Sequence, residues 1–245
     1  VPLAIAFALW ERRQHRTNGP ELLPLNLMTN RNYVIGTLMT ATFFSTLPGF
    51  FLTFAMFLQQ GFGFTPLQSG LTTVPFSAGI FVASLISGRL GNITPRLRVI
   101  TGVLMVIAGM AALRYQIMGF GDVADRVALL PWLLLSGLGM GIAIAPMFQL
   151  VLAGVPPHDA GSGSGALQAI QQVGSALGIA IVSQIFFADL ASSVAAGIAN
   201  HAAYIHALAT GLFYNFGGYA LVLIAVLMMR AQAGPAVQER PLPVE

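Results

Sequence analysis

A glycine-rich stretch, AGSGSGALQAIQQVGSALGIA at residues 160–180, has the spacing that first suggests chemistry in this sequence. Three glycines within five residues, followed by a helical pattern, can form a loop whose backbone N–H groups bind a phosphate. The spacing here is G-x-G-x-G rather than G-x-G-x-x-G, and no buried strand precedes it. The chain also contains no lysine, which a phosphate loop requires. The sequence therefore argues against a nucleotide site.

The same glycines suit close packing between helices. Asp159 precedes them and can act as the N-cap of a helix. Small residues four apart lie on one helical face and let two backbones approach each other in lipid. We therefore expect helix packing at three pairs of glycines: Gly137 with Gly141, Gly161 with Gly165, and Gly174 with Gly178.

Histidines, serines and carboxylates form no recognisable catalytic centre. His201 and His206 are separated by about 140° around a helix, so they make a poor metal pair. No G-x-S-x-G nucleophile motif is present, and the chain has no cysteine for thiol chemistry or a cysteine-based zinc site. The acidic residues all fall in expected loops or at helix ends rather than at mid-membrane depth. The sequence predicts neither an enzyme nor a bound metal or cofactor.

Composition points to lipid as the solvent. The chain has 245 residues, of which 56% are hydrophobic and 8% charged, whereas a soluble domain carries about 25% charged residues. The mean hydropathy is +0.78. Although the pI is near 9.8, the arginines are scattered between apolar runs and form no stripe, so we expect no nucleic-acid partner.

The apolar runs predict the domain organisation. Residues 1–10, VPLAIAFALW, have the character of the end of a truncated transmembrane helix, and 11–31 is expected to be a cytoplasmic linker. Residues 32–229 form the membrane domain, and 230–245 a cytoplasmic tail. About 20 apolar residues span a bilayer. The domain has six such runs, at 33–57, 67–88, 98–118, 128–152, 164–187 and 206–229.

Arginine placement predicts the orientation, because basic residues concentrate in cytoplasmic loops. With the 11–31 linker inside, only Arg114 and Arg126 fall outside. The arginines that fall inside are Arg12, Arg13, Arg16, Arg31, Arg89, Arg96, Arg98, Arg230 and Arg240. This imbalance favours a cytoplasmic C-terminus.

Two runs carry side chains suited to flat lipophilic or cationic molecules. In run 33–57, Pro48 removes a backbone hydrogen bond near mid-depth, and aromatics recur at helical spacing. Such a stripe also suits packing against lipid or other helices. Run 128–152 has methionines near Pro146, which suit adaptable surfaces. Gln168 and Gln172 must either bond other helices or line a cavity. The substrate-cavity candidates are Phe43, Thr46, Phe50, Phe54, Met147, Gln149, Gln168 and Gln172.

Three motifs carry a family resemblance that covers nearly the whole chain. They are FLQQGFGFTPLQSGLTTVPFSAG at 57–79, GRLGNITPRLR at 88–98 and DAGSGSGALQAIQQVGSALGIAI at 159–181. Together they resemble the C-terminal half of a major facilitator superfamily transporter. More narrowly, they resemble the 14-helix drug:proton antiporter branch of multidrug exporters. The second motif is similar to a degenerate copy of the cytoplasmic loop signature, with Asn92 in place of Asp.

The resemblance implies an all-α fold of two inverted three-helix repeats that works by alternating access. It implies gating roles for Gly88, Asn92 and Arg96, and places the first helix of each repeat at the cavity. It also implies a bacterial inner-membrane location, a small amphipathic substrate, a proton gradient as the energy source, and the missing N-terminal half as partner. The alternatives are an exporter of one metabolite, siderophore or lipid, and a half-size scaffold that must dimerise.

Overall fold

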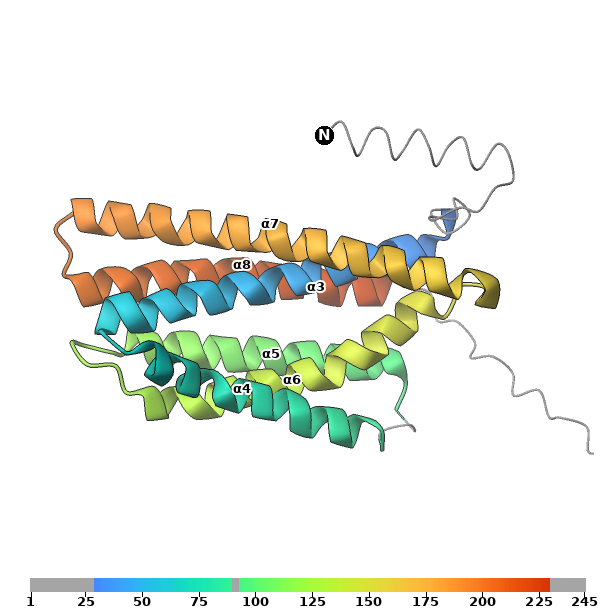
Figure 1. Ribbon diagram of the computed structural model, residues 1–245, viewed down its shortest axis with the longest axis horizontal. Coiled ribbons are helices and arrows are strands. Elements are labelled where there is room, and N and C mark those ends of the chain that lie inside the picture. Colours follow the sequence, from blue (N-terminus) through green and yellow to red (C-terminus); the bar gives the residue numbers. More distant parts are fainter. Residues whose placement is uncertain (1–28, 90–92, 230–245) are drawn as a thin grey trace, which may run out of the picture.

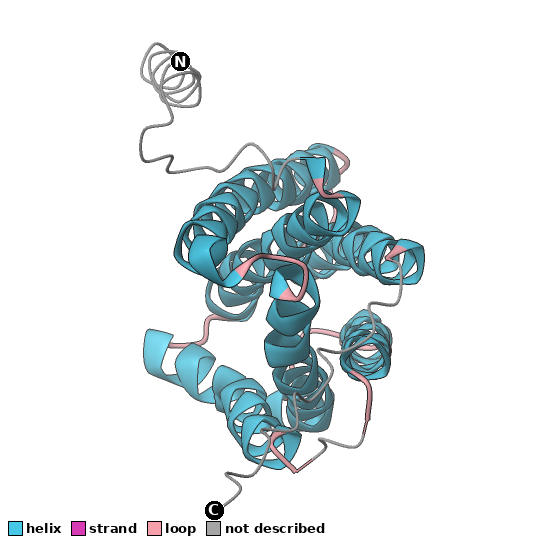
Figure 2. Ribbon diagram, turned by 90° about the vertical axis from the view of Figure 1, so that its right-hand side faces the viewer, coloured by secondary structure: helices cyan, strands magenta, loops and turns pink. Residues whose placement is uncertain are grey.

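The computed structural model describes residues 29–89 and 93–229, and these two ranges contain helices and loops but no strand (Figures 1 and 2). The predicted partial helix at 1–10, nearly all of the 11–31 linker and the 230–245 tail lie outside the described residues. The elements are α3 (Arg31–Met56), the π-helical turn η1 (Phe57–Gly61), α4 (Pro66–Ser87), α5 (Pro95–Met118), α6 (Arg126–Leu152), the 3₁₀ turn η2 (Pro157–Asp159), α7 (Ala160–Ala195) and α8 (Asn200–Met228).

Six of these segments are long and apolar enough to cross a membrane, and each matches one of the predicted runs, although α4 and α8 end one residue before their runs do. Helix α7 is much longer than its predicted run at 164–187. At 1.5 Å per residue its 36 residues extend about 54 Å, beyond a hydrocarbon core of about 30 Å. The difference arises because an α-helix continues wherever its own backbone bonds allow, whereas the hydropathy pattern reports only the part that suits lipid.

Side-chain caps define where several helices begin. Asn30 accepts hydrogen bonds from the N–H groups of Asn32 and Tyr33, and Thr65 forms a capping box with Gln68 at the start of α4. The expected cap by Asp159 is absent. Asp159 instead ends the 3₁₀ turn η2, outside the extended conformation that a cap adopts, and its carboxylate lies 3.1 Å from the imidazole of His158.

The six membrane-length helices pack as two groups of three that do not follow chain order. Helix α3 packs against α7 and α8, while α6 packs against α4 and α5 (Figure 1). In chain order, however, the triplets are α3–α4–α5 and α6–α7–α8. Helices α3 and α6 cross the membrane in opposite directions, so the triplets are inverted repeats. The first helix of each repeat therefore packs against the last two helices of the other repeat, and neither repeat can form these contacts alone.

Backbone contact at glycines holds both groups together. In α7, Gly174 and Gly178 lie against the backbone of Ala41 and Ser45 in α3. In α6, Gly137 and Gly141 lie equally close to α4, where a Cβ on Gly141 would stand 2.6 Å from the carbonyl oxygen of Ile80. Lipid supplies no hydrophobic drive between helices, so close approach of this kind must stabilise the bundle.

The packing expectation does not extend to Gly161 and Gly165. Neither has any atom within 4 Å of an added Cβ. The first turns of α7 do contact α3, since the Tyr33 hydroxyl donates to the carbonyl of the buried Gly163 at 2.9 Å, but Gly161 and Gly165 are exposed. The four-residue spacing is the same as in the packed pairs, so the face on which the glycines lie, and not their spacing, decides whether a neighbour is present.

A matched pair of alanine substitutions tests this difference. In the full-length protein, Gly178→Ala places a methyl group against the immovable carbonyl of Ser45, and we expect a loss of about 1–3 kcal/mol with a lower melting temperature in detergent. Gly165→Ala meets open space and raises helix propensity, so its melting temperature should stay level or rise. Equal melting temperatures for the two variants would contradict the packing assignment.

Candidate functional site

Pro48 lies 18th in α3 and frees one backbone carbonyl in the middle of the helix. Because proline has no N–H, it cannot donate to the carbonyl of Phe44, four residues earlier. The hydroxyl of Ser175, on α7, donates to this oxygen at 3.3 Å. A helix break inside a membrane is tolerated where a neighbour receives the freed group in this way.

Helix α8 adds further polar contacts beside the break. The side-chain amide of Asn215 donates to the carbonyl of Thr46 at 3.0 Å, and the hydroxyl of Tyr214 donates to the Ser45 hydroxyl at 2.9 Å. Asn215 is only 1% exposed. The segment before Pro48 is therefore fastened from two helices by hydrogen bonds. Asn215 was not among the residues predicted from the sequence, although it is a lone asparagine in an apolar run.

Five of the residues predicted to line a substrate cavity are buried inside the helix bundle. Their shared property is that each is at most 1% exposed: Phe43, Thr46, Phe50, Phe54 and Met147. Phe50 stacks on Phe54 with ring centroids 5.3 Å apart, and Phe43 meets Tyr219 of α8 edge to face at 5.8 Å. This placement differs from the expectation because helical spacing is the same for a core stripe and a cavity stripe.

The aromatic residues that follow these buried positions in the sequence lie on the more exposed side of α3 and α6. Phe44 lies 6.2 Å from Phe148 of α6, measured between ring centroids, and both rings are half-buried. Phe51 meets Phe76 of α4 edge to face at 5.0 Å. Gln149 follows Phe148 and is exposed. We define Phe44, Phe148 and Gln149 as the aromatic face; it joins the two proline-containing first helices of the repeats.

The other predicted residues are distributed over three places. Gln168 and Gln172 are exposed on α7, and neither side chain bonds another helix within the described ranges. Gly88 ends α4 beside a groove of about 740 Å³ that Gln149 also lines. Arg96 points elsewhere and donates to the carbonyl of Leu227 at the end of α8, at 2.8 Å. Asn92 lies outside the described residues. Of the two described gating candidates, Gly88 thus borders the groove and Arg96 bonds the end of α8.

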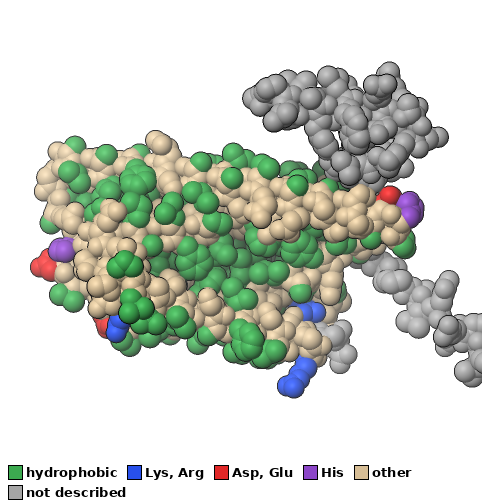
Figure 3. All heavy atoms as spheres, in the orientation of Figure 1, with side chains coloured by type: hydrophobic (Ala, Val, Ile, Leu, Met, Phe, Trp, Pro, Cys, Tyr) green, Lys and Arg blue, Asp and Glu red, His purple; other side chains and the backbone are tan. Residues whose placement is uncertain are grey.

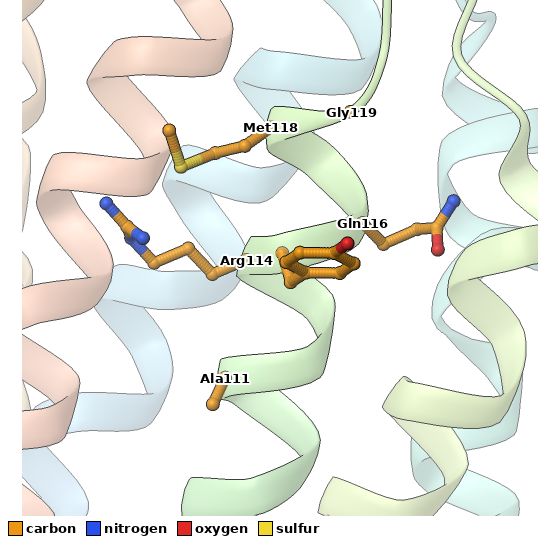
Figure 4. Close-up of a pocket in the computed structure, with 6 residues that line it drawn as sticks. Ala111, Arg114, Gln116, Met118 and Gly119 are labelled. Atoms are coloured by element: carbon orange, nitrogen blue, oxygen red, sulfur yellow. The ribbon is translucent and has the colours of Figure 1, made fainter.

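A second hollow, of about 410 Å³, lies at the opposite ends of the helices (Figure 4). Arg114 and Gln116 extend to opposite sides of α5 there. The guanidinium of Arg114 lies 4.6 Å from the centre of the Phe213 ring of α8, and its Nε donates to the carbonyl of Ala209 at 3.1 Å. Tyr115 is 83% exposed, as is common for aromatics at a membrane boundary. These contacts anchor α5 to α8 and leave little that could select a ligand.

Charges and apolar side chains are segregated along the molecule. Figure 3 shows apolar side chains over the middle of the visible face and arginine, aspartate and histidine at its two ends. Six membrane-length helices in two inverted, interlocked triplets, with a proline break in each first helix, define a polytopic membrane protein of the transporter class.

Comparison with known proteins identifies the family. The sequence profile of the Major Facilitator Superfamily matches residues 2–179, and the chain belongs to this superfamily. The fold described above is accordingly the all-α membrane fold expected from the motifs.

Curated relatives are named as drug or antibiotic transporters. The chain is 33% identical to the probable actinorhodin transporter of Streptomyces coelicolor, an alignment that covers 79% of this chain and 34% of that protein. It is 31% identical to the puromycin resistance protein pur8 of Streptomyces alboniger, with 94% and 44% covered. It is 28% identical to the multidrug resistance protein Stp of Mycobacterium tuberculosis, with 78% and 35% covered. The chain thus spans less than half the length of these relatives.

The role of Ser175 can be tested by a double-mutant cycle with Pro48. Ser175→Ala leaves the Phe44 carbonyl without a donor, and we expect a loss of about 0.6–1.7 kcal/mol in the full-length protein. In a Pro48→Ala background the restored N–H satisfies that carbonyl, so the loss should shrink. Thermal or denaturant unfolding in detergent measures both.

Ser183→Ala is the matched control, because the hydroxyl of Ser183 lies on the same helix, is buried and has no hydrogen-bond partner. Its removal should leave stability unchanged. An equal effect of Ser175→Ala in both backgrounds would show that the hydroxyl does not serve the proline break.

Proposed function

We propose that this chain is the C-terminal half of a secondary transporter that exports drugs or other amphipathic small molecules. The observation that carries the proposal is the set of relatives, named as drug and antibiotic transporters, of which this chain spans only a part. An N-terminal half of similar size would supply the opposite wall of a central cavity. A transporter role also agrees with the absence of any enzyme signature in the sequence.

Alternating access is the mechanism we propose. The two halves rock about a central site, and the first helices of each repeat flank it. Pro48 in α3 and Pro146 in α6 weaken those helices at the level where they would bend. The hydrogen bonds from Ser175 and Asn215 support the same region of α3, so bending there need not leave an unsatisfied backbone group.

A proton gradient is the proposed energy source. Within the described helices the acidic residues lie near the ends, as with Asp189, which is six residues from the end of α7. A proton-binding carboxylate in the middle of the membrane would therefore belong to the other half of the transporter. This chain would contribute binding surface and movement rather than the coupling group.

The proposed location is a bacterial inner membrane, and the proposed orientation has the C-terminus in the cytoplasm. Among the described residues, Arg31, Arg89, Arg96 and Arg98 lie at one end of the helices, and Arg114 and Arg126 at the other. The positive-inside rule assigns the first end to the cytoplasm. The C-terminal end of α8 lies at that same end, where Arg96 contacts it.

The substrate surface is proposed to be the aromatic face of Phe44, Phe148 and Gln149. Two half-buried rings 6.2 Å apart offer stacking area to a flat molecule, and an exposed amide beside them can donate and accept hydrogen bonds. Stacking without shape-specific contacts suits a range of aromatic cations and neutral amphiphiles.

Export of a single aromatic metabolite is the second candidate. One relative is named a probable actinorhodin transporter, and another a tetracenomycin C resistance and export protein of Streptomyces glaucescens. A dedicated exporter would use the same fold and the same energy source. It would differ in the number of compounds that the cavity accepts.

Two phenylalanine substitutions in the full-length protein test the aromatic face. Phe148→Ala removes a half-buried ring, so we expect normal expression with a changed pattern of resistance across a panel of dyes and antibiotics. Phe50→Ala empties a buried site and should cost about 3 kcal/mol or more, lowering the yield of folded protein. Minimum inhibitory concentrations and membrane expression levels measure the two effects.

An unaltered resistance pattern for Phe148→Ala at normal expression would exclude the aromatic face from the substrate path. Efflux of the same compounds from cells, measured with and without an ionophore that collapses the proton gradient, tests the coupling. Continued export after the collapse would rule out the proton gradient. A single exported compound in the whole panel would favour the dedicated exporter.

A further inference from the structure

The groove between the arginine-bearing ends of α4, α5 and α6 has features that the transport cycle proposed above does not use. Its volume of about 740 Å³ falls within the range of about 300–1,000 Å³ typical of ligand pockets. It opens at the arginine-bearing end of the spans and extends along α6 from Gly141 to Gln149, a residue that also belongs to the aromatic face. Its described lining residues include Ser84 and Ser87 of α4, Arg98 of α5 and Gln149 of α6.

Arg98 is the unusual member of this lining. It lies in the first turn of α5 and is only 8% exposed. One of its terminal nitrogens donates to the carbonyl oxygen of Ser87 at 2.9 Å and also contacts the Ser87 hydroxyl. Its Nε is buried and has no hydrogen-bond partner. A guanidinium offers five N–H donors, so these two contacts leave much of its capacity unused.

Among the described residues, no negative charge neutralises this buried guanidinium. Within residues 29–89 and 93–229, no carboxylate lies within 4 Å of Arg98. The ion pair that these two ranges contain joins His158 with Asp159 instead. A buried charge without a partner is strongly destabilising, whereas one that meets an anion is not. The two nearby arginines do not share the problem: Arg89 is exposed, and Arg96 is half-buried with its guanidinium bonded to α8.

The surroundings suit an anion with several oxygen atoms. The exposed amide of Gln149 lines the same groove as Arg98 and can donate to an oxygen of a bound group, whereas the Ser84 hydroxyl already donates to the carbonyl of Ile80 at 2.8 Å. The backbone N–H groups at the start of α5 add positive partial charge beside it. Arginine binds phosphate through two parallel N–H···O bonds, which a single carbonyl partner does not provide.

We propose that this groove is a phosphate-binding site in which Arg98 is the principal ligand. The occupant is a phosphate group, carried either by an anionic phospholipid headgroup or by a free phosphate. Its position at the end of the spans makes a headgroup accessible from the bilayer, and the groove is open enough to admit a soluble anion. Its principal ligand, Arg98, is not part of the proposed substrate surface.

Thermal unfolding of the full-length protein in detergent tests the proposal directly. Delipidated protein is titrated with phosphatidylglycerol, with phosphatidylcholine, and with inorganic phosphate against chloride at equal ionic strength. We expect a saturable rise in melting temperature with at least one phosphate-bearing probe. Arg98→Gln should weaken the apparent affinity for that probe at least fivefold. Arg96→Gln removes a charge two residues away that contacts α8 instead, and it should bind as the wild type does.

The probes separate the two sources of phosphate. Stabilisation by phosphatidylglycerol but not by inorganic phosphate assigns the site to a lipid headgroup, and the converse assigns it to a free phosphate. If Arg98→Gln does not fold, Ser84→Trp introduces a bulky side chain into the groove from an exposed position and keeps the guanidinium, and it should abolish the same response. The proposal is overturned if no probe stabilises the wild type, or if the response survives Ser84→Trp. It is also overturned if Arg98→Gln and Arg96→Gln weaken it equally.

Discussion

Close approach of backbones at glycine is the contact on which the rest of this structure depends. Helix α6 reaches α4 at Gly137 and Gly141, and α7 reaches α3 at Gly174 and Gly178. In lipid these contacts stand in for the hydrophobic drive that assembles soluble helices. They also join helices from different repeats, so the inverted triplets interlock. Without them the first helices would have no fixed position, and neither the aromatic face nor the groove would exist.

The proline in α3 shows how a backbone carbonyl freed within the membrane obtains a hydrogen-bond donor. Pro48 frees the Phe44 carbonyl, and a buried oxygen without a donor is costly in a medium that lacks water. The hydroxyl of Ser175 reaches it from α7, the helix that the glycines bring close, while Asn215 bonds the adjacent turn from α8. Close packing and polar satisfaction are thus two parts of one arrangement, which leaves α3 able to bend at a defined level.

Buried arginine at the end of the spans poses the opposite problem. Arg96 and Arg98 are two residues apart, yet one lies on the surface against α8 and the other is enclosed by α4 and α5. Residues two apart lie about 200° apart around a helix, so they face different neighbours. The enclosed charge is the one that needs a partner from outside the described chain. Gln149 borders both the groove beside it and the aromatic face, so the two surfaces adjoin.

The membrane spans and the family could be predicted from the sequence alone. Bilayer thickness and hydropathy determined the six spans, and the loop motifs with the glycine pairs indicated the superfamily. Tertiary structure alone decided which side of each helix is covered. Phe43 and Phe44, like Phe50 and Phe51, are only about 100° apart around α3, and an apolar face is wide enough to include both. Contact with α7 and α8 buried the first of each pair and left the second half-exposed, because a helical period carries no information about which neighbour will arrive.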